Sequence, residues 1–349
     1  MAPSGMSRQA FGAQFVGADG FLNTPTYGLP PRFTAEAMRD CVQSWEEGRL
    51  QIAAFEEPLR ASRSAYASLI GADECRVAMG TSVSALIGLV AASIPDGSRV
   101  ATLRGEFTSV SFPFAAQAGR GVTVTELAPG QLEDVAGDFD LVAASLVQSA
   151  DGAVLDVETL RGSVAESDTV TVLDVSQALG WKNVALPWVD VAVAASYKWL
   201  LGPRGVAWMS LSQRILDTLV PHTANPYAGA DMWSSLYGLP MRLADDARRF
   251  DSSPAWFSVS GAAASLTWLA SLDRTAVEAH TLGLANRLRA ELQLPACESA
   301  IVSVPAAHAS DALQRAGIRA AVRAHATRVG FHLYNTDADL DRLLDALRP

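Results

Sequence analysis

Two residues that follow strand-like stretches, Asp174 and Lys198, are the pair best suited to chemistry in this sequence of 349 residues. Asp174 ends the apolar run 169–173, and Lys198 comes shortly after the apolar run 189–195. In an open sheet of parallel strands, the carboxyl ends of the strands border the ligand crevice. We therefore expect this carboxylate and this amine to converge on one site, although 24 positions separate them in the chain.

A lysine beside a buried strand loses hydration, which lowers its pKa and makes it a nucleophile toward aldehydes. A neighbouring carboxylate can hold a protonated pyridine nitrogen. Pyridoxal phosphate requires this combination, a lysine that forms a Schiff base and an acidic partner for the ring nitrogen. The spacing of Asp174 and Lys198 alone is equally consistent with a plain ion pair at the edge of the sheet.

Motifs around these two residues carry a resemblance to a known family. The chain contains D-x-x-Q at 174–177, S-x-K-W at 196–199 and G-P-x-G at 202–205. Together they resemble the class V aminotransferase superfamily of fold type I pyridoxal phosphate enzymes. That group includes cysteine desulfurases, kynureninases, isopenicillin N epimerase-like proteins and ergothioneine-type C–S lyases. The resemblance covers nearly the whole chain, from LNTPTYGLPP to RVGFHLYNTDADLDRLLDAL.

The resemblance implies a role for each residue of the central motifs. It implies that Lys198 holds pyridoxal phosphate as a Schiff base and, once freed by substrate, acts as the base at the α-carbon. Asp174 is then the partner of the pyridine nitrogen. Gln177 is similar to the residue that hydrogen-bonds the ring hydroxyl, and Ser196 matches a phosphate-binding serine. Gln148 and Ser149 fall near another position that often touches the ring hydroxyl.

Further cofactor contacts are expected at two places. Thr81 and Ser82 follow Gly80 at a predicted helix start, where backbone amides and short hydroxyls form a phosphate cradle; a plain helix N-cap is the alternative. Phe107 stands where relatives place an aromatic residue or a histidine stacked on the cofactor ring, for which a flat apolar face suffices. The alternative for Phe107 is an ordinary core position.

The remaining candidates concern the substrate and a second subunit. Arg328 matches the arginine that grips the substrate α-carboxylate through two parallel hydrogen bonds; the alternative is a surface arginine on a strand. Asn23 and Tyr27 lie in the N-terminal segment that borders the substrate pocket in relatives. Ser253 resembles a residue that reaches the phosphate of the neighbouring subunit, which implies a homodimer with shared active sites; its alternative is an exposed turn.

The reaction expected is a C–S lyase reaction, the β-elimination of a thiol-type group from a cysteine S-conjugate or sulfoxide. Desulfurases need a cysteine shortly before the substrate-binding arginine, and the segment 317–327 contains none. The G-E-F sequence at 105–107 also looks like the G-E-aromatic sequence of ergothioneine-type lyases. The alternatives are an aminotransferase or an epimerase of the same superfamily, and a non-catalytic pyridoxal-phosphate-binding protein.

The elements that position these residues alternate between strands and helices from about residue 34. This alternation predicts an α/β protein with a large, doubly wound, mainly parallel sheet. A smaller C-terminal α+β domain follows. We predict an N-terminal segment 1–20, a large cofactor-binding domain 21–257 and a small domain 258–349. The strands predicted for the two domains are 77–79, 100–103, 122–125, 140–144, 169–173, 189–195, 205–211, 300–304 and 329–333.

Composition narrows the partners and the compartment. Asp and Glu (37) outnumber Lys and Arg (27), and this acidic balance argues against nucleic acid as a partner. No apolar run is long enough to span a membrane. Three scattered cysteines without metal-ligand spacing, and no apolar signal-peptide region, predict a cytoplasmic protein with no structural metal. The expected partner is a small amino-acid substrate.

Overall fold

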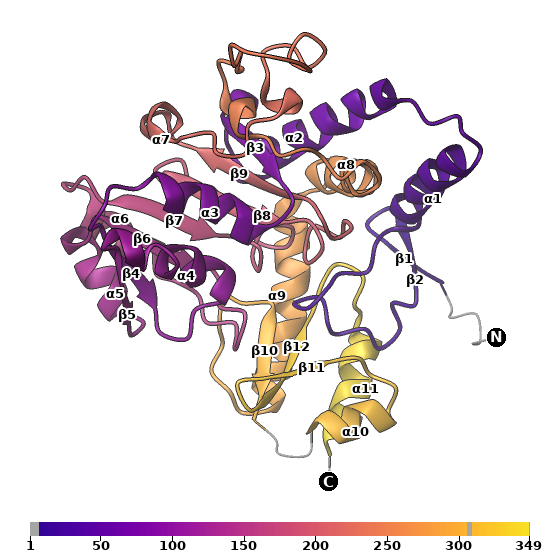
Figure 1. Ribbon diagram of the computed structural model, residues 1–349. Coiled ribbons are helices and arrows are strands. Elements are labelled where there is room, and N and C mark those ends of the chain that lie inside the picture. Colours follow the sequence, from indigo (N-terminus) through magenta and orange to yellow (C-terminus); the bar gives the residue numbers. More distant parts are fainter. Residues whose placement is uncertain (1–6, 306–308, 349) are drawn as a thin grey trace.

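The structure is a computed structural model that describes residues 7–305 and 309–348 (Figure 1). A seven-stranded sheet in the order β3-β9-β8-β7-β6-β4-β5 forms its centre. In this sheet β9 runs antiparallel to the other six strands, which are parallel to one another. The predicted α/β class with a large, mainly parallel sheet is confirmed. The strands of this sheet are β3 (Val77–Gly80), β4 (Arg99–Leu103), β5 (Thr123–Leu127), β6 (Leu141–Ser145), β7 (Val170–Asp174), β8 (Val191–Ala195) and β9 (Ala207–Leu211).

Helices bury both faces of the large sheet. Because successive side chains of a strand point to opposite faces, β6 sends Val142 and Ala144 into one hydrophobic cluster and Leu141 and Ala143 into another. One face carries α2 (Glu56–Ile70), α5 (Gln131–Val135), α6 (Val157–Val164) and α8 (Trp256–Ala270). The other carries α3 (Val83–Ser93), α4 (Thr108–Ala115) and α7 (Gln213–Thr218). Burial on both faces explains why strands such as β8 (VAVAA) are apolar at every position.

A second, three-stranded antiparallel sheet in the order β10-β12-β11 lies below the large one in Figure 1. Its elements and the helices around it are β10 (Ile301–Val304), β11 (Ala321–Arg323), β12 (Ala326–Gly330), α9 (Arg274–Glu291), α10 (Ala309–Arg315) and α11 (Asp337–Leu347). These helices and the sheet share a hydrophobic core of their own. Residues 21–23 cross to this sheet, since Phe21 bridges Arg319 and Asn23 bridges Gly330.

The remaining elements are short or peripheral. They are the hairpin β1 (Ser7–Ala10) and β2 (Ala13–Val16), α1 (Arg32–Glu46), and the 3-10 turns η1 (Ile52–Phe55), η2 (Glu74–Arg76), η3 (Ala118–Arg120), η4 (Ala136–Asp138), η5 (Pro226–Ala228) and η6 (Ala247–Phe250). The predicted domain boundaries after residues 20 and 257 stay a prediction, and positions 1–6 of the first segment lie outside the described residues. No helix within 7–305 and 309–348 is long and apolar enough to cross a membrane.

One strand was predicted at the wrong position along the chain. The strand expected at 329–333 is β12 at 326–330, three residues earlier. The N–H of Gly330 donates to the carbonyl of Leu22, and the N–H of Phe331 still donates to the carbonyl of Ala300 at 3.1 Å, so backbone pairing continues one residue past the strand. Beyond it, Phe331 stays fully buried without being in the strand. The apolar run 329–333 was therefore a core segment that extends past the strand.

Candidate active site

Asp174 and Lys198 lie at the same edge of the large sheet, as expected. Strands β7 and β8 are parallel neighbours, with Asp174 opposite Val193, and Lys198 follows three residues after the end of β8. Both side chains are buried, at 5% and 6% exposure. One oxygen of Asp174, Oδ1, accepts a hydrogen bond of 2.8 Å from the backbone N–H of Ser176. The parallel arrangement thus brings together two groups that are distant in sequence.

The Lys198 amine has the environment of a nucleophile. Its Nζ lies 5.1 Å above the centre of the Phe107 ring. Burial lowers the pKa of Lys198 below its ordinary value; the Asp174 charge opposes this shift, and the Arg328 and Arg204 charges add to it. No ion pair formed by the described residues joins Asp174 to Lys198. The plain ion-pair alternative is therefore not what the structure contains.

Gln177 is held on three sides in the turn after β7. Its Oε1 accepts a hydrogen bond of 2.7 Å from the indole N–H of Trp199. Its Nε2 donates to the carbonyl of Pro25 at 3.0 Å and to Oγ of Ser149 at 3.1 Å. The residue predicted to meet the cofactor ring thus connects the N-terminal segment, the loop after β6 and the residue next to Lys198.

Arg328 enters the site from the small sheet, on β12. It is 1% exposed, and burial lowers its pKa to about 10. Its Nη2 donates to Thr26 Oγ1 at 2.8 Å, and its Nη1 donates to Ser149 Oγ at 3.1 Å and to the carbonyl of Ser149. No carboxylate among the described residues pairs with it. A buried guanidinium that has only neutral partners carries a charge that a carboxylate ligand would neutralise.

The predicted phosphate contacts differ in their surroundings. Ser82 is the N-cap of α3 and accepts a hydrogen bond of 3.2 Å from the N–H of Ala85, so the capping alternative is realised whether or not it also binds phosphate. Thr81 is exposed beside it. Ser196 Oγ is fully buried and has no hydrogen-bond partner among the described residues. A Cβ placed on Gly202 would lie 2.1 Å from this oxygen, so only glycine leaves it room.

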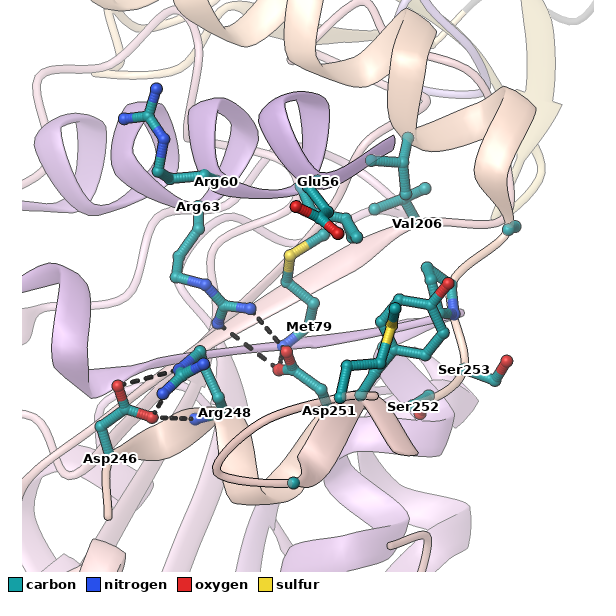
Figure 2. Close-up of a pocket in the computed structure, with 18 of the residues that line it drawn as sticks. Glu56, Arg60, Arg63, Met79, Val206, Asp246, Arg248, Asp251, Ser252 and Ser253 are labelled. Carbon is teal, nitrogen blue, oxygen red and sulfur yellow. Dashed lines mark hydrogen bonds and ion pairs between the residues drawn. The ribbon is translucent and has the colours of Figure 1, made fainter. Parts of the chain in front are cut away.

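The other candidate residues lie around the margin. Ser253 is exposed and lines a cleft of about 660 Å³ between α2 and the segment after η6 (Figure 2), which Lys198 does not line. Asn23 pairs with Gly330 of β12 through a β-bridge, and its Oδ1 is buried with no hydrogen-bond partner among the described residues. Tyr27 is half exposed, and its ring contacts Phe21 edge-on at 5.2 Å.

Sequence reasoning assigned no function to Glu106. This buried carboxylate accepts hydrogen bonds from the N–H of Phe107, from the N–H and hydroxyl of Ser145, and from Nε2 of Gln148. Burial raises its pKa, against the effect of these donors. It ties the loop that carries Phe107 to the end of β6. Only its place in G-E-F, between a turn glycine and Phe107, pointed to it in the sequence.

Thr26 and Pro25 were missed as well, since no spacing in the sequence relates them to Arg328 and Gln177. Within the described residues, no three His, Cys, Asp or Glu side chains gather as a metal site would require.

Comparisons with known proteins agree with this geometry. The sequence model of the family described as "Aminotransferase class-V" matches residues 52–311. The chain therefore belongs to the class-V aminotransferase family. It is 27% identical over 309 residues to an uncharacterized aminotransferase of Bacillus subtilis (strain 168), with 82% of each chain covered. It is 25% identical over 379 aligned positions to isopenicillin N epimerase of Streptomyces clavuligerus, with 93% of each covered.

A third relative and two solved structures complete the comparison. The chain is 30% identical over 172 residues to a probable hercynylcysteine sulfoxide lyase of Mycobacterium tuberculosis (strain CDC 1551 / Oshkosh), covering 46% of this chain and 42% of that protein. Its fold matches the cystine C–S lyase C-DES (TM-score 0.82, 17% identity, 94% and 97% covered) and a cysteine desulfurase of Thermococcus onnurineus NA1 (TM-score 0.81, 20%, 94% and 93%).

The predicted family, fold type and class of enzyme are confirmed: the chain is a pyridoxal-phosphate-dependent enzyme. Its own residues fit that cofactor. Lys198 is a buried amine with a lowered pKa that forms no ion pair with any described residue, which suits condensation with an aldehyde. The Ser196 hydroxyl, which has no hydrogen-bond partner among the described residues, is a donor available to a ligand.

Proposed function

We propose that this enzyme acts at the α-carbon of an amino acid and that its reaction is C–S lysis, the β-elimination of a thiol or sulfenate from a cysteine S-conjugate or sulfoxide. The observation that carries the first part is the buried Arg328 guanidinium without a carboxylate partner in the described chain, in the same site as the Lys198 amine. A substrate carboxylate at Arg328 directs the rest of an amino acid toward Lys198.

Each step assigned to the protein uses a residue in place. Arg328 and Ser149 hold the substrate carboxylate and orient the Cα–H bond toward Lys198. Bound pyridoxal phosphate supplies the electron sink that accepts the charge left at the α-carbon. Asp174 keeps the ring nitrogen protonated, Gln177 and Ser149 face the ring hydroxyl, and Phe107 covers the ring. These roles are proposals from the placement of the residues.

The elimination balances without an oxidant. Lys198 takes the α-proton, the Cβ–S bond breaks with both electrons on sulfur, and a Cα=Cβ double bond forms. The sulfur group leaves as a thiol after protonation. Water then converts the released enamine into pyruvate and ammonia. For a cysteine S-conjugate, the whole reaction consumes one water and yields pyruvate, ammonia and a thiol.

Two features favour elimination over the other reactions of this family. The turn between β11 and β12, which precedes Arg328, consists of Ala324 and His325, both with positive φ, and carries no cysteine to accept sulfur. Cys297 lies elsewhere, with its N–H bonded to Asn286. Phe107 stands over Lys198 where a histidine would supply a second proton donor, which epimerisation through two bases requires.

The alternative function is an aminotransferase or an epimerase. It is supported by the two relatives matched over most of their length, the aminotransferase and isopenicillin N epimerase. A transamination would use the same base, because Lys198 would remove the α-proton and then deliver it to the bound cofactor. A non-catalytic pyridoxal-phosphate-binding protein is a third, weaker reading, since it leaves the combination of Lys198 and Arg328 without a purpose.

A panel of cysteine S-conjugates, cysteine sulfoxides and proteinogenic amino acids separates these functions. We expect pyruvate and thiol release from at least one sulfur substrate, and loss of that release in Lys198→Ala. The chain has only two lysines, so Lys182→Arg is a matched control that should retain activity. Amino transfer to a keto acid without pyruvate would identify an aminotransferase, and inversion of configuration an epimerase. Full cofactor occupancy without α-proton exchange in deuterated water would contradict catalysis altogether.

We also propose a homodimer with shared active sites, in the cytoplasm. Support for the dimer is the segment 232–241 beside the Ser253 cleft, where Tyr237 and Leu239 are 89% and 88% exposed. Apolar side chains grouped at a surface mark an interaction site.

All three cysteines are unpaired, which is typical of a reducing compartment.

A further inference from the structure

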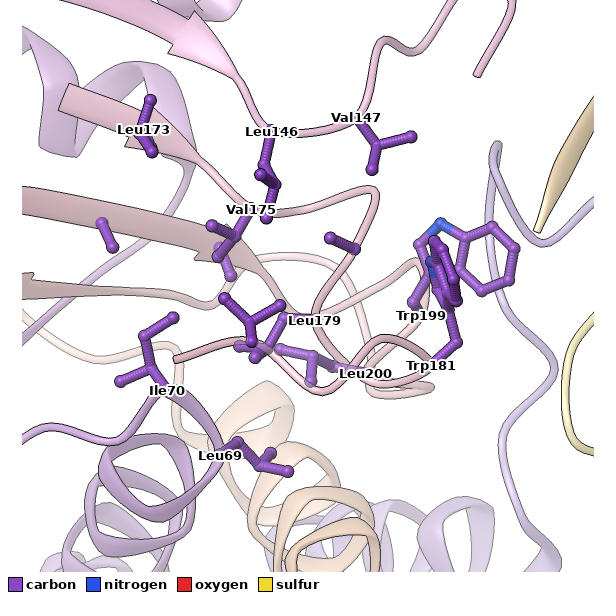
Figure 3. Packing of buried hydrophobic residues seen from close by; sticks show 14 of the residues in the cluster. Leu69, Ile70, Leu146, Val147, Leu173, Val175, Leu179, Trp181, Trp199 and Leu200 are labelled. Carbon is purple, nitrogen blue, oxygen red and sulfur yellow. The ribbon is translucent and has the colours of Figure 1, made fainter. Parts of the chain in front are cut away.

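Trp199, the residue after Lys198, is fully buried and makes one polar side-chain contact, the bond of 2.7 Å from its indole N–H to Oε1 of Gln177. Figure 3 shows Trp199 beside Trp181 at one end of the hydrophobic cluster, and their ring centres are 5.8 Å apart. An indole N–H can only donate, so the atom facing it must be the amide oxygen of Gln177. The Pro25 carbonyl can only accept, so it must face the amide nitrogen. The orientation of this side chain is therefore fixed from both ends.

The orientation of Gln177 determines a hydrogen-bond chain that crosses the site. With its oxygen turned to Trp199, Gln177 gives its second N–H to Ser149 Oγ, which also accepts from Arg328 Nη1. Two donors on the Ser149 oxygen leave its own proton free for an anionic oxygen of a bound ligand. A flipped amide would present an oxygen to the Pro25 carbonyl and remove the donor from Ser149.

Trp199 itself is clamped by the C-terminal region. Nε2 of His332 donates to the Trp199 carbonyl at 2.9 Å, and the two rings meet edge-on at 5.2 Å. His332 is fully buried, and burial lowers its pKa to about 3, so it is neutral over the working pH range. A Cβ on Gly180 would lie 2.3 Å from the Trp199 carbonyl oxygen, and one on Gly330 would lie 3.2 Å from the indole ring.

We propose that Trp199 is a positioning residue of this site: its indole N–H locks the Gln177 amide so that the nitrogen donates to Ser149, which leaves the Ser149 proton for an oxygen of the bound ligand. It does not touch the reacting atoms. Through Gln177 it joins the two ends of the site, Lys198 with the cofactor and Arg328 with the substrate carboxylate. This inference rests on the proposed roles of Gln177 and Lys198.

The test replaces the indole N–H and reads the bound cofactor. In Trp199→Phe the Gln177 oxygen loses its donor, and only the contacts of its nitrogen with Pro25 and Ser149 still hold the amide. We expect the pH midpoint of the visible absorbance change of the bound cofactor to shift by at least half a pH unit. We expect the affinity of the protein for the cofactor to fall about tenfold, the effect of one lost hydrogen bond. Trp181→Phe is the matched control. Its indole N–H donates at the same length, 2.7 Å, to the backbone carbonyl of Gln177, so it should lower stability without moving the midpoint.

A double-mutant cycle shows whether Trp199 acts through Gln177. In the Gln177→Ala background, Trp199→Phe should add no further shift. An equal shift in both backgrounds, an unmoved midpoint in Trp199→Phe, or the same shift in Trp181→Phe would overturn the proposal. If Trp199→Phe does not fold, Trp199→His keeps a ring N–H and should retain the wild-type midpoint; a midpoint displaced as in Gln177→Ala would contradict the assignment. Failure of the wild type to hold cofactor on Lys198 would instead refute the proposed function.

Discussion

At the scale of single residues, burial leaves the two basic groups of the site, Arg328 and Lys198, in different charge states. Arg328 keeps its full charge at pH 7 even though burial lowers its pKa to about 10, whereas burial moves Lys198 toward the neutral amine. One group is thereby suited to hold an anion and the other to attack a carbonyl. The Arg328 charge also lowers the pKa of Lys198, so Arg328 supports the neutral state of that amine.

The first prediction concerns Arg328. Arg328→Lys keeps a positive charge but loses the planar fork that bonds to Thr26 and Ser149. We expect kcat/KM for the amino-acid substrate to fall about 10- to 100-fold, the range for a lost charge-assisted hydrogen bond, mainly through KM. Steady-state kinetics measure this, with cofactor affinity as the control. An unchanged KM would show that Arg328 does not bind the carboxylate.

The second prediction concerns pH. Only the neutral amine of Lys198 condenses with pyridoxal phosphate, and burial lowers its pKa below the ordinary 10.5. Covalent uptake of cofactor by the cofactor-free protein should therefore speed up as pH rises and level off below pH 10.5. Because the Asp174 charge raises the pKa of Lys198, Asp174→Asn should move the midpoint to still lower pH. Absorbance stopped-flow measures this, with N-acetyl-lysine as the unburied control; equal midpoints would refute the effect.

At the scale of elements, one buried ion pair anchors the β3 edge of the large sheet. Arg63 on α2 bonds Asp251, which also accepts from the N–H of Met79 on β3 at 2.8 Å (Figure 2). Both side chains are 7% exposed. The pair ties α2, the edge strand β3 and the start of the Ser253 segment to one another.

Removing one partner of that pair is the third prediction. Asp251→Ala leaves the Arg63 charge buried and unpaired, so the free energy of unfolding should fall by about 3–5 kcal/mol. The nearby pair of Arg248 and Asp246, also drawn in Figure 2, is more exposed, and Asp246→Ala should cost less than about 1 kcal/mol. Urea unfolding compares the two. Similar losses would mean that burial does not distinguish them.

At the scale of the whole molecule, the two sheets meet at the site. The large sheet supplies Asp174 and Lys198 from its carboxyl edge, and the small sheet supplies Arg328. Residues 25 and 26 contact both parts of the site. The Pro25 carbonyl accepts a hydrogen bond from Gln177, and the Thr26 hydroxyl accepts one from Arg328. Movement of the small sheet relative to the large one would change the distance between substrate carboxylate and base.

The fourth prediction tests the proposed homodimer. If Ser253 binds the partner's cofactor phosphate, dilution below the dissociation constant of the dimer should release cofactor together with subunits. Ser253→Ala should weaken cofactor affinity several-fold and leave the dimer intact, because one hydrogen bond is lost and no apolar contact. Light scattering and cofactor fluorescence are measured on the same dilution series. A monomer that keeps full cofactor affinity would contradict the shared site.

The central pair was predictable from sequence because parallel strands impose it. Asp174 and Lys198 each follow an apolar run, and any parallel sheet puts both at one edge. The fold class followed from the same alternation. The strand at 329–333 was misplaced because an apolar pattern reports burial, and burial continues beyond the end of β12 at Gly330.

The sequence alone therefore determined the family, the fold and the placement of Asp174 and Lys198 at one edge of the sheet, since local patterns and short motifs encode them. Only the tertiary structure decided that Thr26 and Ser149 surround Arg328, that Glu106 fastens the Phe107 loop, and that Trp199 donates a hydrogen bond to Gln177. Thr26 and Arg328 are 302 positions apart, so no local spacing records their hydrogen bond. Such contacts arise because the packing of the two sheets and of residues 21–27 brings together buried polar groups that are distant in sequence, and most of these groups are then hydrogen-bonded.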